Sequence, residues 1–243
     1  MESQTYRTSP DQRHLTYNLI EILCVFLPAF TIVELTSSWV GENPTRSFII
    51  VWAVNLLMLG LIWGSLKLRS QQLKDLGVSF GPVRIKEVLR VFSLSLLVFV
   101  LGTVAFLLGP VITTIFTEAP QNADFTRYEF LKDNLSGLFL SLTGVYFISS
   151  FGEEFIYRAF LINRINDITG PSKYASIMAV LISAALFGVI HYEWGLMGMI
   201  QTTCMGLVMG IFYIKLKKSF WILVLAHMYM DTLLFVQIYL ASN

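Results

Sequence analysis

Long apolar segments recur along the whole chain, and their length is the feature that most restricts its fold. Each contains about 17 to 25 mostly apolar residues, the length that a helix needs to cross roughly 30 Å of hydrocarbon. Only 14% of the 243 residues are charged, whereas soluble domains carry about a quarter. The segments are residues 19–35, 48–66, 88–108, 138–160, 174–191, 196–214 and 220–240. The sequence therefore predicts an all-α, polytopic transmembrane helix bundle of about seven spans, with seven to eight as the range.

Lys and Arg are distributed unevenly over the connections between these segments. Fourteen of the 17 lie in the N-terminal segment or in and beside the connections after the second, fourth and sixth segments. The three on the other side are Arg46, Arg127 and Lys132. Because cytoplasmic loops carry the excess of cations, we expect a cytoplasmic N-terminus and an exterior C-terminus.

The remaining composition is typical of one integral-membrane domain over residues 1–243. The polar N-terminal residues precede an apolar run long enough to stay as an anchor, so we expect no cleaved signal peptide. Cys24 and Cys204 lie in apolar segments and indicate neither a disulfide framework nor a thiolate metal site. A net charge of +1 provides no basic surface for nucleic acid. We expect a multi-pass protein of the cell (plasma) membrane, in contact with the lipid bilayer.

The longest connection, residues 109–137, lies between the third and fourth segments. Asp124 can cap a helix, and Phe125, Tyr128 and Leu131 follow at intervals of three. This pattern predicts either a short helix at the membrane interface or a packed loop.

Charged side chains inside apolar segments are costly in lipid, so they mark function, ion pairing or a water-filled cavity. We find four such places, listed in chain order: Glu21 and Glu34; Glu153, Glu154 and Arg158; His191 with Glu193; His227 with Asp231. For the two glutamates of the first segment we expect the side chains to reach the two membrane interfaces.

The stretch FGEEFIYRAF places two adjacent glutamates in the fourth segment. On a helix, Glu154 and Arg158 share a face and can form an ion pair. Glu153 points about 100° away, so it needs another partner or must take up a proton, which suits a general base. The alternative interpretation is a capping box from Ser150 to Glu153, with Glu154 and Arg158 as an ordinary exposed pair.

The three histidines favour the functional interpretation. His14 lies in the polar N-terminal residues, whereas His191 and His227 lie in or beside apolar segments. A single intramembrane histidine is usually a hydrogen-bonding residue between helices. Two of them, with Asp231 one turn after His227, need partners that lipid does not provide.

These residues resemble the motifs of the CAAX prenyl endopeptidase and bacteriocin-processing family of intramembrane proteases, also called CPBP or Abi. The motifs are Glu-Glu-x-x-x-Arg, Phe-x-x-x-His and His-x-x-x-Asn/Asp. Here they are, in order, Glu153, Glu154 and Arg158; Phe187 and His191; His227 and Asp231. The resemblance covers about residues 138–234, the expected protease core.

The resemblance implies hydrolysis of a peptide bond, in a peptide or membrane-protein substrate, by an activated water molecule. Glu153 would be the general base, and His191 would position the water. Glu154 and Arg158 would form an ion pair that orients Glu153, and His227 would face the developing oxyanion. The family often has Asn where this chain has Asp231, so we expect Asp231 to orient His227 instead.

Depth along the helices restricts this model. Counted from the cytoplasmic cations at 1.5 Å per residue, His227 lies roughly 10 Å deep, Glu153 roughly 16 Å and His191 roughly 27 Å. The three can meet only if helices tilt or if the fifth helix projects into the cytoplasm.

Three alternatives stay open. We favour a hydrolase without a cofactor, but Glu153, His191 and His227 could instead bind zinc with a water as the fourth ligand. The charged cluster could serve only to hold helices together in a non-catalytic interaction or bacteriocin self-immunity protein. A transporter is less favoured, because the sequence has no visible repeat relating two halves.

Overall fold

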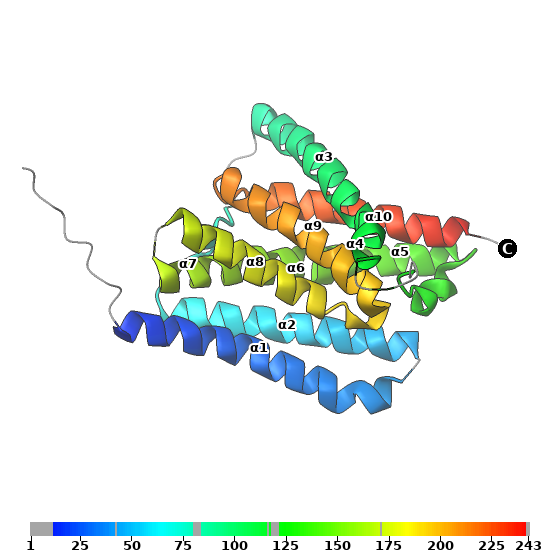
Figure 1. Cartoon of the computed structure of the whole chain (residues 1–243), viewed down its shortest axis with the longest axis horizontal. Helices are drawn as coiled ribbons and strands as arrows, with labels where there is room; N and C mark the ends of the chain where they lie inside the picture. The colour runs from blue at the N-terminus through cyan, green and yellow to red at the C-terminus, as the bar shows by residue number, and fades with distance from the viewer. Residues whose placement is uncertain are drawn as a thin grey trace, which may run out of the picture.

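A computed structural model describes residues 12–41, 43–79, 84–115, 117, 122–170 and 172–241, which form a bundle of helices (Figure 1). The long helices are α1 (Gln12–Val40), α2 (Pro44–Leu68), α3 (Ile85–Leu107), α8 (Lys173–Val189), α9 (Gly195–Lys215), α10 (Phe220–Leu240) and one continuous helix over Leu135–Thr169. Short helices are η1 (Leu73–Leu76), α4 (Gly109–Thr113), η2 (Thr126–Leu131) and η5 (Tyr192–Trp194). No strand occurs in these residues, which confirms the all-α prediction.

Within the described residues, six helices are long and apolar enough to cross a membrane, namely all of the long helices except α8. The fifth expected segment, residues 174–191, corresponds to α8, which has 17 residues and is apolar but shorter. The chain is therefore an integral, multi-pass membrane protein with six such spans and one shorter apolar helix. The expected count of about seven includes this shorter helix.

The long helices run alternately in opposite directions (Figure 1). One end of the bundle holds the start of α1 and the connections from α2 to α3, into α8 and from α9 to α10, where most Lys and Arg residues lie. We call this the cation-rich end. Arg46, Arg127 and Lys132 belong to the opposite end, so the arrangement agrees with a cytoplasmic N-terminus.

Local signals explain where several helices begin. The side chain of Asn43 accepts a hydrogen bond from the backbone N–H of Arg46 at the start of α2. The helix over Leu135–Thr169 begins in the same way at Asn134, and α8 begins at Ser172. Such caps satisfy N–H groups that have no partner within the helix.

The continuous helix over Leu135–Thr169 consists of α5 (Leu135–Gly144), η3 (Val145–Ser150), α6 (Phe151–Glu153), η4 (Glu154–Ile162) and α7 (Asn163–Thr169). It lies in the middle of the bundle (Figure 1), and residues 152–165 are buried on every side. Charged groups on this stretch must therefore find partners within the protein. Segments η3 and η4 are π-helical, a geometry that occurs often at functional sites.

This continuous helix contradicts the capping-box interpretation. Ser150 lies in mid-helix, and its hydroxyl donates to the carboxylate of Asp231 at 2.6 Å. Glu154 and Arg158 are fully buried, so they are not an exposed pair.

The connection between α4 and α5 contains the expected short helix, η2. The carboxylate of Asp124 accepts hydrogen bonds from the backbone N–H and the hydroxyl of Thr126, at 2.9 and 2.6 Å. Leu131 is fully buried against Leu138, Val145 and Phe235, so this helix also packs on the protein.

Glu21 is buried among protein partners, whereas we expected its side chain to extend towards a membrane interface. Its buried carboxylate accepts hydrogen bonds from Arg69 at 2.6 Å, from Nη2 of Arg164 at 3.0 Å and from the hydroxyl of Ser65. It also forms an ion pair with Nε of Arg164 at 2.8 Å. The cluster joins α1, α2 and α7 near the cation-rich end, and we call it the Glu21 cluster. Glu34, in contrast, is exposed as expected.

Candidate active site

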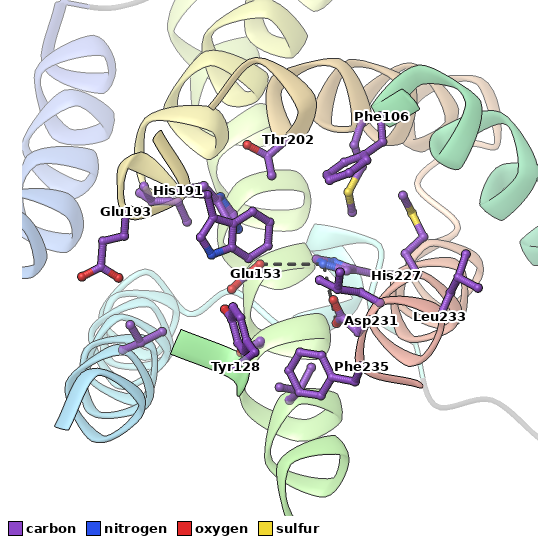
Figure 2. Close-up of a pocket in the computed structure, with 18 of the residues that line it drawn as sticks. Phe106, Tyr128, Glu153, His191, Glu193, Thr202, His227, Asp231, Leu233 and Phe235 are labelled. Atoms are coloured by element: carbon purple, nitrogen blue, oxygen red, sulfur yellow. Dashed lines mark ion pairs between the residues drawn. The ribbon is translucent and has the colours of Figure 1, made fainter. Parts of the chain in front are cut away.

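A cavity of about 270 Å³ lies among α2, α3, the Leu135–Thr169 helix, α10, η2 and the turn between α8 and α9. Its lining includes Glu153, His191, His227 and Asp231, four of the residues singled out in the sequence (Figure 2). The lining extends from the middle of the bundle to Arg127 and Glu193, which are partly exposed at the end opposite to the cation-rich end.

Glu154 and Arg158 form the ion pair that their spacing predicts. Their side chains are fully buried, with Nη1 of Arg158 at 3.0 Å from Oε1 of Glu154. The same Glu154 oxygen lies 2.9 Å from Nδ1 of His227. Because a carboxylate only accepts, Nδ1 of His227 carries a proton and donates it. The ion pair thus reaches from the fourth apolar segment to α10 and orients the imidazole of His227.

Phe187 explains why the second motif requires an aromatic residue four positions before His191. Its ring is fully buried and lies under the guanidinium of Arg158, 4.3 Å from the ring centroid. The same ring packs edge-on against His191 at 4.9 Å and His227 at 6.0 Å, between centroids. Phe187 therefore stabilises the buried cation and separates the two imidazoles at a fixed spacing.

His191 lines the same cavity as Glu153 and His227, so the three side chains come together. His191 lies directly after α8, at the same level of the cavity.

The orientation of His191 follows from one backbone contact. Its Nδ1 lies 2.7 Å from the carbonyl oxygen of Phe187, and a carbonyl only accepts. Nδ1 therefore carries the proton, which leaves Nε2 as an acceptor in the neutral ring. The ring also packs against Trp194 at 4.7 Å.

Asp231 does not lie behind His227 as expected. Its Oδ2 is 3.8 Å from Nε2 of His227, on the same nitrogen that faces Oε2 of Glu153 at 3.8 Å (Figure 2). Glu154 occupies the orienting position at Nδ1. Glu154 can reach Nδ1 because it comes from a neighbouring helix. Asp231 lies one turn after His227 on the same helix, and this i, i+4 spacing brings it to the cavity side of the ring. Ser150 holds Asp231 in place.

Several cavity residues were not assigned to the site from the sequence. Arg127 is hydrogen-bonded to Ser47 at 2.8 Å and forms an ion pair with Glu193. Tyr128 and Trp194 line the cavity beside them. Glu193 was noted as a charged neighbour of His191, but sequence spacing contains no signal for a partner 66 residues away.

A zinc site would require several His, Cys, Asp or Glu side chains to converge on one point. Among the described residues, no group of three or more His, Cys, Asp or Glu side chains has the arrangement of a metal site.

The helix bundle and its internal cavity, lined by acids and imidazoles, define the class: an integral membrane protein with a buried polar site. Residues 135–233 match the family described as type II CAAX prenyl endopeptidase Rce1-like, so this segment of the chain is similar to that family. The matched segment includes all six proposed site residues and omits α1, α2, α3 and Tyr128. No curated protein and no solved structure matches the chain.

Proposed function

We propose that the protein is an intramembrane endopeptidase in which Glu153 and His191 activate a water molecule to hydrolyse a peptide bond. One observation supports this most strongly. Glu153, His191 and His227 come from three helices and line one cavity, while the Glu154–Arg158 pair holds His227 from behind.

The proposed reaction begins with a water molecule between the carboxylate of Glu153 and Nε2 of His191. Glu153 takes a proton from the water as its oxygen attacks the carbonyl carbon of the substrate. The tetrahedral intermediate then collapses, the C–N bond breaks, and Glu153 returns the proton to the leaving amine. Nε2 of His191 accepts the second hydrogen bond of the water and so fixes its direction of attack.

His227 is proposed to stabilise the oxygen that becomes negative. Its Nε2 is 3.8 Å from both Glu153 and Asp231, too far for a hydrogen bond to either. A protonated Nε2 is therefore free to donate to a substrate oxygen. A donor fixed in this way needs little reorganisation when the oxyanion forms.

The cavity also restricts the kind of substrate. At about 270 Å³ it is slightly below the usual range of pockets that enclose a small molecule. It can hold a scissile bond with its adjacent side chains, but not a folded domain. We propose that the substrate is a peptide, or an extended segment of a membrane protein.

The experiment that tests this function compares membranes from cells that carry the wild type, Glu153→Gln or Glu34→Gln. Glu34→Gln is the matched control, because it removes an exposed carboxylate remote from the cavity. Comparative proteomics should find a peptide whose processing occurs with the wild type and Glu34→Gln and stops with Glu153→Gln.

The same strains separate catalysis from a purely binding role. If folded Glu153→Gln and His191→Ala proteins supported the full cellular phenotype, with processing unchanged, the peptidase proposal would be wrong. The non-catalytic interaction or immunity function would then be preferred.

A further inference from the structure

We propose that Tyr128 is an additional catalytic residue, whose phenol donates a hydrogen bond to the carbonyl oxygen of the scissile bond. This inference rests on the proposed peptidase function. Tyr128 belongs to η2, in the connection between α4 and α5, outside the segment that matches the family.

The position of Tyr128 is the first support. Its side chain lines the same cavity as Glu153, His191, His227 and Asp231, and Figure 2 shows it next to Glu153. The charges of Glu153 and Asp231 act on its phenol, so both carboxylates lie near this hydroxyl. A carbonyl bound for attack by a water on Glu153 comes within reach of the phenol.

The second support is that η2 is fixed to the rest of the site from several sides. Arg127, the preceding residue, is bonded to Ser47 of α2 and to Glu193. The backbone N–H of Asp124 donates to the carbonyl oxygen of Trp194 at 3.1 Å. A hydroxyl held in this way needs little reorganisation when charge develops on the substrate.

The ring of Tyr128 is held as firmly as its backbone. It packs against Phe48 at 5.7 Å, Phe235 at 5.3 Å and Trp194 at 6.1 Å between ring centroids. These contacts come from α2, α10 and η5, so three separate elements determine the direction of the phenol.

The third support is the hydrogen-bonding state of the phenol. Burial raises the pKa of Tyr128 to about 12, although the charge of Arg127 acts in the opposite direction. The hydroxyl is therefore protonated at neutral pH and can donate its hydrogen. Within the described part of the chain, no acceptor bonded to this hydrogen is found.

A protonated phenol of this kind is suited to an oxyanion. It would complement Nε2 of His227, so that two donors from different elements face the oxygen of the tetrahedral intermediate. Removal of one donor of an oxyanion site lowers kcat by about 100- to 1,000-fold.

The test uses full-length protein in proteoliposomes and a library of internally quenched peptides of randomised sequence. Tyr128→Phe should lower kcat about 100- to 1,000-fold with KM nearly unchanged, because the lost interaction acts mainly in the transition state. Its melting temperature should match the wild type, since the ring contacts remain. The matched control is Tyr146→Phe, which loses a hydroxyl bonded to Thr232 outside the cavity lining and should retain kcat.

The outcomes separate the two proposals. Full activity of Tyr128→Phe, with Glu153→Gln inactive, would overturn the role of Tyr128 and leave the peptidase intact. A fall in melting temperature with normal kcat per folded molecule would also overturn it, because the hydroxyl would then be structural. If the wild type cleaved no peptide while the protein was folded, both proposals would be contradicted.

Discussion

Two buried groups of charged residues lie within the apolar helices, and they differ in how their charges are used. One is the Glu21 cluster. The other, which we call the Glu153 cluster, consists of Glu153, Glu154, Arg158, His191, His227 and Asp231. In the Glu21 cluster one carboxylate accepts bonds from two arginines, and its residues do not line the central cavity. In the Glu153 cluster the Glu154–Arg158 pair is buried, whereas Glu153, His227 and Asp231 face the cavity at distances longer than a hydrogen bond.

This difference shows that a charge within a membrane helix is not by itself evidence of catalysis. A carboxylate with every oxygen bonded to an arginine stabilises the helices that it joins. A carboxylate that faces a cavity, with a neighbouring imidazole that has a free nitrogen, can exchange a proton with a ligand. The following predictions separate the two cases.

The largest effect is expected for Glu153→Gln. The amide keeps the shape of the side chain but cannot act as a base, so peptide cleavage should fall about 100- to 10,000-fold. The melting temperature of the purified protein should stay close to that of the wild type. Cleavage at the wild-type rate would show that Glu153 is only structural and would remove the contrast between the clusters.

Glu21→Ala should lower the stability of the protein and leave its peptidase activity unchanged. It leaves two guanidinium groups side by side without their carboxylate, and loss of one partner of a buried ion pair typically costs about 3–5 kcal/mol. Thermal unfolding in detergent would measure this loss. The activity per folded molecule should be unchanged.

A double substitution serves as the control for the Glu21 cluster. Glu21→Leu combined with Arg164→Leu should be less destabilising than Glu21→Leu alone, because the more deeply buried of the two cations is removed together with its partner. Loss of activity in the folded fraction would contradict a purely structural role for the cluster.

A smaller effect is expected for Asp231→Asn. The amide oxygen can still accept the hydrogen bond from Ser150, and Glu154 still orients His227 at Nδ1. We expect kcat to fall by about tenfold or less, from the loss of one charge that favours protonated His227. A loss as large as that of Glu153→Gln would instead make Asp231 the essential base.

No effect is expected from metal removal. We propose that the reaction needs no cofactor, so dialysis against a chelator should leave the rate of peptide cleavage unchanged. Loss of activity that zinc restores would favour the alternative site of Glu153, His191 and His227.

The sequence predicted the helices and the site motifs because both depend on local spacing. Apolar segments long enough for a bilayer gave the helix bundle, and the i, i+4 interval gave the Glu154–Arg158 pair. The partner of His227 at Nδ1 could not be predicted in this way, because Glu154 lies 73 residues earlier in the chain.

The other features that the sequence did not predict also depend on contacts between distant segments. The partners of Glu21 come from α2 and α7, and the contribution of Tyr128 depends on how η2 folds back over the cavity. The burial of Arg164 could not be predicted either, because its partner Glu21 lies in a distant segment of the sequence. Each of these features depends on contacts between segments that sequence periodicity does not describe.

The position of the cavity has a consequence for the order of events in the cell. The cavity reaches Arg127 and Glu193 at the end of the bundle opposite to the cation-rich connections. With a cytoplasmic N-terminus, a newly synthesised peptide would meet Glu153 only after export across the bilayer. Secretion would then precede cleavage, and the ectodomains of neighbouring membrane proteins would already be on the accessible side.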